Sequence, residues 1–180
     1  MTAATPLTVI VQHRFQPPSP GWRDHLGEQV RYLGHEGTPL FARSMPAVGP
    51  AEARARLEAS CGQHVAFHRL ILSVALQSGV RSQGDVEHWT VALLEDLEQR
   101  LQRDLVYVAA AHRGEGVLHS HVLVAGRAYL WGTLRRAEVH LHLEDCAYLR
   151  TQGTELAHTV AASRAARAAR LTRYLGRTTP

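Results

Sequence analysis

Three histidines lie at the junction of two apolar stretches, in LVYVAAAHRGEGVLHSHVLVAG (105–126). They are His112, His119 and His121. Neutral imidazoles are common metal ligands, and three protein ligands leave positions open for water or substrate. Histidines also occur as ordinary buried or surface residues. The three residues therefore have three possible explanations at this stage: a metal site, core histidines or surface histidines.

The segments around the histidines favour the metal site. Residues 104–112 and 119–126 are apolar enough to form two strands, and the glycine-rich segment between them predicts a hairpin. Side chains alternate between the faces of a strand, so His119 and His121 share one face, and the hairpin brings His112 alongside them. Three imidazoles on adjacent strands suit Mn²⁺, Co²⁺, Ni²⁺ or Zn²⁺, and Mg²⁺ when phosphate oxygens complete the shell.

Strands and helices alternate through the rest of the chain. We expect strands at 7–13 and 65–76, and a short edge strand or turn segment at 38–44. The helical patterns fall at 24–34, 49–60, 82–103, 133–152 and 155–177, with Asp24 and Asp85 as the N-caps of the first and third and Pro50 in the first turn of the second. The hairpin makes the fold class α+β, with a central antiparallel β-sheet and flanking helices. His140 and His142 fall on the helix predicted at 133–152, where they would point apart and lie at the surface.

Length and composition predict one domain. The chain has 180 residues, of which 45% are hydrophobic, enough for a single core. We divide it into a main domain, residues 1–150, and a basic C-terminal helix, residues 151–180, packed on or extending from it. No apolar run is long enough to cross a bilayer and no basic leader precedes the first one, so we expect no membrane insertion and no signal peptide. Cys61 and Cys146 form no spacing motif, which favours reduced thiols in a cytoplasmic protein.

The positive charge of the chain comes from arginine alone. All 20 basic residues are Arg, the formal net charge is +4 and the sequence pI is about 9.6. Guanidinium groups bind phosphate bidentately and stack on bases, so the composition permits a nucleic-acid partner. In the predicted last helix, one side carries Arg167, Arg170, Arg173 and Arg177. That side is either an ordinary solvated face or a surface that follows DNA phosphates.

Two segments, VAAAH (108–112) and HSHVLV (119–124), are separated by six residues. Together they resemble the three-histidine motif of mobilisation relaxases, the tyrosine-dependent HUH single-strand DNA endonucleases. FHRLILSV (67–74) looks like the strand of that family that ends in serine. VRYLGHEGTPLF (30–41) resembles the segment that carries its nucleophilic tyrosine. The resemblance covers about residues 7–150. The chain departs from the pattern in the loop of residues 113–116, which lacks the usual aspartates, and in Ala125, Gly126 and Arg127 after the second strand.

The resemblance implies a relaxase-like HUH fold and metal-dependent, site-specific nicking and religation of single-stranded DNA through a 5′-phosphotyrosyl intermediate, in plasmid or mobile-element mobilisation or replication. Tyr32 would be the nucleophile, with Tyr129 as second choice, and Glu115 the acid that orients a histidine or assists the metal. The three histidines would hold a divalent ion, Mg²⁺ or Mn²⁺ first, with Zn²⁺, Co²⁺ or Ni²⁺ possible. Accessory mobilisation proteins are possible partners. Single-stranded DNA would be the main partner, contacted by Arg31, Arg69, Arg113, Arg127 and the four tail arginines.

Two alternatives stay open. The chain could be a binding module that keeps the fold and binds single-stranded DNA without cleaving it. It could also be an unrelated three-histidine metalloenzyme, in which Glu115 serves as a carboxylate ligand and DNA is not a substrate. Metal binding without DNA cleavage would select the first. The second would need no basic surface, and DNA turnover should be absent.

Overall fold

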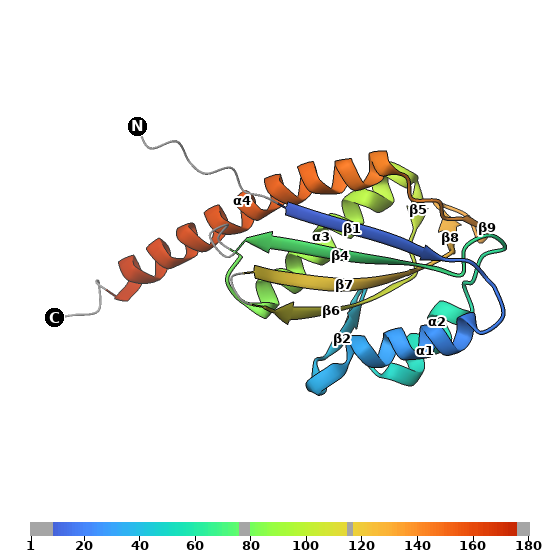
Figure 1. Cartoon of the computed structure of the whole chain (residues 1–180). Helices are drawn as coiled ribbons and strands as arrows, with labels where there is room; N and C mark the ends of the chain where they lie inside the picture. The colour runs from blue at the N-terminus through green and yellow to red at the C-terminus, as the bar shows by residue number, and fades with distance from the viewer. Residues whose placement is uncertain (1–8, 76–79, 115–116, 176–180) are drawn as a thin grey trace.

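A computed structural model of the protein describes residues 9–75, 80–114 and 117–175, with side chains as far as residue 160. Six strands form one antiparallel sheet (Figure 1). In spatial order these strands are β1 (Val9–Gln16), β4 (Phe67–Ala75), β7 (Val117–Ala125), β6 (Tyr107–Arg113), β2 (Leu40–Ala42) and β3 (Met45–Val48). The predicted α+β class, with a central antiparallel sheet and flanking helices, is confirmed.

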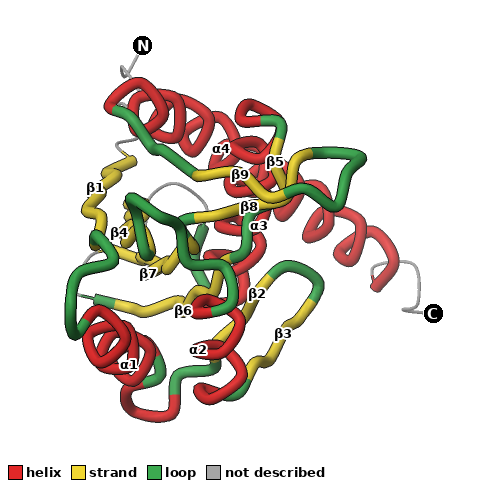
Figure 2. Tube along the Cα trace, turned by 90° about the vertical axis from the view of Figure 1, so that its right-hand side faces the viewer, coloured by secondary structure: helices red, strands yellow, loops and turns green. Residues whose placement is uncertain are grey.

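Two long helices cover one face of this sheet. They are α3 (Gln83–Leu101) and α4 (Leu143–Leu175), and they lie on the opposite side of the sheet from α1 and α2 (Figure 2). Trp89, Leu93 and Leu97 follow helical spacing along α3 and are fully buried. The Trp89 indole also donates to the Gly153 carbonyl of α4 at 2.9 Å, which joins the two helices. No helix in the described part of the chain is long and apolar enough to cross a membrane.

Two shorter helices cover only part of the other face. They are α1 (Trp22–Leu33) and α2 (Pro50–Glu58), with Pro50 in the first turn of α2 as predicted. Leu26, Val30 and Leu33 of α1 are buried with the β4 and β7 residues Phe67 and Leu123. Phe67 begins β4 and Leu123 lies near the end of β7, so α1 and α2 shield one end of the sheet. The three histidines lie toward the other end, where β6 ends and β7 begins.

A small second sheet replaces part of a predicted helix. β5 (Arg103–Asp104), β8 (Arg127–Leu130) and β9 (Arg136–Glu138) pair in the order β5-β8-β9, so the helix predicted at 133–152 is wrong over its first half. From β9 to α4, Val139 and Leu141 are buried whereas His140 and His142 are exposed. This alternation has the period of extended chain, and the helix begins only at Leu143. The helix then runs unbroken past residue 150, and the division of the chain into residues 1–150 and 151–180 stays a prediction.

Three local expectations also need correction. Ser82, and not Asp85, is the N-cap of α3; Asp85 occupies the third helical position and completes a reciprocal capping box. Asp24 lies in the first turn of α1 because Gly21, at φ 83°, occupies the cap position. Residues 38–44 supply β2, which lies between β6 and β3 and not at the sheet edge.

Glycine is required where the chain leaves β7. A Cβ atom at Gly126 would lie 1.6 Å from the carbonyl oxygen of Val65. The Gly126 amide donates to the Ala66 carbonyl at 3.0 Å, which holds the two backbones together. This close approach fixes the end of the histidine strand against the segment that enters β4.

Candidate metal and nucleophile site

The three histidine rings lie together on one face of β6 and β7. His112 pairs directly with His119 across the two strands, and His121 follows two residues later on the same face. The His112 and His119 ring centroids are 5.7 Å apart with the rings nearly parallel. The His121 ring stands almost perpendicular to both, at 5.2 Å from His112 and 5.1 Å from His119. The predicted hairpin and its shared face are therefore confirmed.

Burial favours the neutral form of all three imidazoles. It lowers the pKa of His112, His119 and His121, and brings that of His121 to about 4. For His121 the other two histidines and Arg69 lower the pKa further. Neutral imidazole is the form that binds metal.

Two ring nitrogens of this cluster have no hydrogen-bond partner among the described residues. They are His112 Nε2 and His121 Nδ1, both buried, and buried polar atoms without partners are uncommon in folded proteins. Among the residues that the structure describes, however, no three His, Cys, Asp or Glu side chains already present their donor atoms as a metal site. The donor type and the placement of the rings fit a divalent ion, and the rings would have to rotate about their side-chain torsions to coordinate it.

Tyr32 lies beside the histidine cluster. It is on the last turn of α1, whose inward face is formed by Leu26, Val30 and Leu33, so its own side chain is left 53% exposed. The Tyr32 ring meets the His121 ring edge-on, with centroids 5.3 Å apart and planes at 88°. The residues that the sequence pattern indicated as nucleophile and metal ligands are therefore neighbours in space.

The other described tyrosines near the sheet have different surroundings. Tyr107 is buried in β6, its hydroxyl has no partner within the part of the chain that the structure describes, and burial raises the pKa of that hydroxyl. Tyr129, the second choice, lies in β8, where its hydroxyl accepts from Arg136 and its ring stacks under the same guanidinium. β8 follows the end of β7 that lies away from His119. Neither tyrosine shares the exposed position of Tyr32 beside the histidines.

Glu36, noted in the sequence only for its spacing from Tyr32, acts electrostatically on His112. Glu36 follows the end of α1 in a single 3-10 turn, with the left-handed φ of 56° that is uncommon outside glycine. Its exposed carboxylate lies 3.8 Å from the His35 ring nitrogen, and its charge raises the pKa of His112, in the direction opposite to burial. Glu115, the acid expected from the sequence, lies outside the described residues. Glu36 is four residues after Tyr32, a spacing that was visible in the sequence but could not show the turn back toward β6.

The predicted DNA-binding arginines are spread over the molecule. Arg31 is exposed beside Tyr32 in the chain, and Arg69 of β4 donates to the Gln29 side chain of α1 at 3.3 Å. Arg113 ends β6 and is exposed. Arg127 lies in β8, beyond the far end of the histidine strand.

The tail arginines follow on or beyond α4. Arg167, Arg170 and Arg173 lie on the part of α4 that extends past the end of the sheet at which β6 ends (Figure 1). Arg177 is outside the described residues. The tail is helical as predicted, and the role of its arginines stays a prediction.

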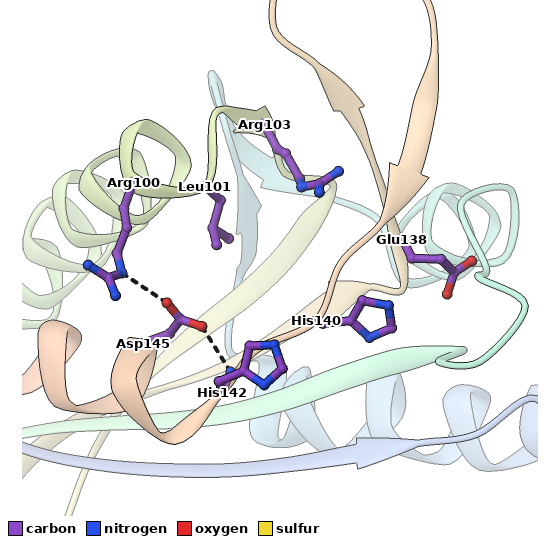
Figure 3. Close-up of a pocket in the computed structure, with 7 residues that line it drawn as sticks. All are labelled: Arg100, Leu101, Arg103, Glu138, His140, His142 and Asp145. Carbon is purple, nitrogen blue, oxygen red and sulfur yellow. Dashed lines mark hydrogen bonds and ion pairs between the residues drawn. The ribbon is translucent and has the colours of Figure 1, made fainter.

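A separate cavity of about 560 Å³ lies beyond the other end of β7, where α3, β9 and the start of α4 meet. Figure 3 shows His140 and His142 at its edge. The Asp145 carboxylate accepts from Arg100 at 2.9 Å and from the His142 amide at 2.9 Å. The Glu138 carboxylate accepts from the backbone amides of Gln63 and His64. Both acids are engaged within the fold, so the cavity does not compete with the histidine cluster as a metal centre.

Comparison with known proteins identifies the fold. The sequence matches no protein-family model and no curated protein. The structure is similar to that of the conjugative relaxase TrwC in complex with OriT DNA in a metal-free state, with a TM-score of 0.53 and 14% sequence identity over 88% of this chain and 70% of that one.

Two further TrwC structures are equally similar. One is a complex with a 27-mer DNA comprising the recognition hairpin and the cleavage site, with a TM-score of 0.52 and 13% identity over 88% of this chain and 69% of that one. The other is a metal-bound complex with OriT DNA, with a TM-score of 0.52 and 12% identity over 88% of this chain and 70% of that one. The chain therefore has the relaxase fold, which the resemblance of its three-histidine motif to that family implied.

Proposed function

We propose that the protein is a relaxase-type enzyme that nicks and rejoins single-stranded DNA with the help of a divalent metal ion, in the mobilisation or replication of a plasmid or mobile element. The observation that carries this proposal is the contact between Tyr32 and His121 within a cluster of three neutral histidines. The tyrosine proposed as nucleophile and the histidines proposed as metal ligands come from distant parts of the sequence and meet on the exposed part of one sheet face. The similarity to DNA-bound TrwC structures supports the same function.

The proposed reaction is a transesterification at phosphorus. The Tyr32 hydroxyl oxygen forms a bond to the scissile phosphorus, and the bond from phosphorus to the 3′-oxygen breaks. The phenol proton leaves to solvent, and the 3′-oxygen takes up a proton as it departs. The phosphotyrosyl bond keeps the phosphodiester energy, so attack by the 3′-hydroxyl reverses the step and rejoins the strand. The exposure of Tyr32 on α1 leaves its oxygen accessible to a strand that approaches the histidines.

His112, His119 and His121 would hold the ion. A bound Mg²⁺ or Mn²⁺, or else Zn²⁺, Co²⁺ or Ni²⁺, would offset the negative charge that builds on the phosphate oxygens. Glu36, whose charge acts on the pKa of His112, is one candidate to orient a histidine or to balance the charge of the site. Glu115 retains that role as a second candidate.

Single-stranded DNA is the proposed partner, with Arg31, Arg69 and Arg113 as the nearest phosphate-binding candidates and the arginines of α4 as a more distant set. The two cysteines are free thiols, which agrees with the cytoplasmic location that we propose for the protein. Accessory mobilisation proteins remain a proposal that rests on the fold alone.

An adduct assay tests the proposal. Purified protein is mixed with a labelled, partly randomised pool of single-stranded DNA and Mn²⁺ and then run on a denaturing gel. We expect a protein–DNA band that withstands detergent, and we expect Tyr32→Phe and His119→Ala to lose it. Tyr129→Phe is the matched control, because its hydroxyl contacts Arg136 and not the histidines, and it should keep the band.

The binding module is the alternative function, and the absence of aspartate in the described part of the 113–116 loop favours it. It predicts bound Mn²⁺ and retained DNA with no adduct in the wild-type protein. Electron paramagnetic resonance of the Mn²⁺-loaded protein and its His121→Ala variant would establish metal binding independently of cleavage. A wild-type protein that binds metal and DNA without an adduct would replace the enzyme proposal by this one.

A further inference from the structure

The sheet face that carries the histidines continues across β4 to the edge strand β1. His121 pairs with Ile71 of β4, and Arg69 lies two residues before Ile71, so its side chain points to the same face. Arg14 of β1 pairs directly with Arg69. The hydrogen bond from Arg69 to Gln29 of α1 confirms the face, since α1 lies on this side of the sheet. Arg14 and Arg69 therefore project from directly opposed positions on the face that carries the proposed active site.

No ion pair in the described part of the chain includes Arg14 or Arg69. Arg43, Arg54 and Arg100, by contrast, each bind a carboxylate at 2.7–2.9 Å. Like charges directly opposite each other on neighbouring strands are destabilising. A pair of this kind on a functional face points to an anion that the protein binds.

The pair lies close to the site where the phosphodiester would be cleaved. Strand geometry, about 3.3 Å per residue along a strand and about 4.8 Å between strands, places the Arg69 backbone roughly 8 Å from that of His121. A stacked DNA strand advances about 3.4 Å per nucleotide and an extended strand more. The separation therefore corresponds to one or two nucleotides.

The exposed column of β1 continues the same surface. Ile10 and Gln12 precede Arg14 at alternate positions, so all three side chains share the histidine face, and Ile10 is 48% exposed. An exposed apolar side chain beside a cation offers a contact for a sugar or base next to a bound phosphate. The surface thus offers an apolar contact beside the two positive charges.

We propose that Arg14 and Arg69 together bind a backbone phosphate of the DNA strand one or two nucleotides from the cleaved bond and so direct that strand over β4 and β1. This inference rests on the proposed function. Paired guanidinium groups suit a phosphodiester because each donates two hydrogen bonds in a fixed plane. Bound DNA would also relieve the repulsion between the two arginines.

Salt dependence of DNA binding tests the site. A short, fluorescently labelled oligothymidylate is titrated with wild type, Arg14→Gln, Arg69→Gln and the double variant over a series of salt concentrations, with fluorescence anisotropy as the readout. The slope of log K against log salt should fall by about 0.7 for each phosphate that the variant no longer neutralises. Arg150→Gln is the control, because Arg150 is exposed on α4, across the sheet. A double variant with the wild-type slope would overturn the inference.

The outcomes separate this inference from the proposed function. Wild-type protein that shows no salt-dependent binding of the oligothymidylate and no adduct would refute the proposed function itself. Wild-type protein that binds and forms the adduct, with an unchanged slope in the double variant, would refute only the role of Arg14 and Arg69.

Thermal unfolding without DNA gives a second, independent readout. Removing one of two repelling charges in Arg14→Gln should raise Tm by up to about 3 °C at low salt, and added salt should cancel the rise. If the Tm of Arg14→Gln does not rise at low salt, the inference that Arg14 and Arg69 repel each other is wrong.

Discussion

Glu98 is a buried acid whose titration should control stability near neutral pH. Its side chain is 1% exposed on α3. The carboxylate accepts from the Leu105 amide at 2.8 Å and from Arg43 Nη1 at 3.3 Å. Burial is the largest influence on it and raises its pKa from 4.5 to about 7, against the opposing effects of the Leu105 amide and Arg43.

The direction of the pH effect follows from this shift. The folded protein holds the Glu98 proton to a higher pH than the unfolded chain does, so the folded state gains stability below pH 4.5 and loses it as pH rises through about 7. At about 1.4 kcal/mol per pKa unit the loss is about 3 kcal/mol. The Glu98→Gln variant keeps a carbonyl oxygen for the Leu105 amide but cannot ionise. The free energy of unfolding of Glu98→Gln minus that of wild type should therefore be about 3 kcal/mol larger at pH 8 than at pH 4.5.

Urea unfolding at several pH values between 4.5 and 8 measures this difference. Contributions from other titrating groups cancel when the two proteins are compared at each pH. The same substitution at Glu155, exposed on α4, is the control and should leave the pH profile of wild type unchanged. A difference between wild type and Glu98→Gln that stays constant across this range would refute the reasoning.

Two further predictions concern the frame around the site. Gly126→Ala should destabilise the protein by about 3 kcal/mol or more, because its Cβ would meet a backbone carbonyl at 1.6 Å. Gly84→Ala is the control: it has open space around it in α3 and should be neutral or stabilising by up to about 1 kcal/mol. A similar Tm for both variants would refute the close approach at Gly126. Burial lowers the pKa of His68 to about 4, so its stabilisation, present above pH 6.5, should be lost as pH falls through 4. That loss is worth about 3 kcal/mol. The free energy of unfolding of His68→Gln should therefore fall less than that of wild type as pH is lowered from 6.5 to 4, and an identical fall in both proteins would contradict the prediction.

The part of the fold that holds the histidines was predictable because its signals are local. Two apolar runs separated by a glycine-rich loop specify a hairpin, and the alternation of side chains places His119 and His121 on one face. The pattern of Trp89, Leu93 and Leu97 likewise specifies the inward face of α3.

The errors arose where local signals conflict. Residues 134–138 are Leu, Arg, Arg, Ala and Glu, all good helix formers, yet Val139 and Leu141 alternate with His140 and His142 in the period of a strand. The pairing of β9 with β8 resolves the conflict in favour of extended chain. In the same way Asp85 suggests a cap, but the hydroxyl of Ser82 takes that position and Asp85 completes the box.

Neighbours from distant segments could not be read from the sequence. The meeting of Tyr32 with His121 depends on how α1 crosses the sheet, and the pairing of Arg14 with Arg69 depends on the register of β1 against β4. Each is set by packing across more than 50 residues of chain. The sequence shows which residue types are present, but only the packing of α1 and the register of the strands bring these residues together.

The most direct test of the proposed mechanism is to locate the DNA on the protein. The adduct formed with Mn²⁺ and single-stranded DNA is treated with nuclease, cut with trypsin after arginine and analysed by mass spectrometry. Because the chain contains no lysine, trypsin should release residues 32–43 as one peptide, and we predict a nucleotide joined to Tyr32 in it. A nucleotide on residues 128–135, which contain Tyr129, or no adduct from folded protein that binds Mn²⁺, would contradict the proposed mechanism.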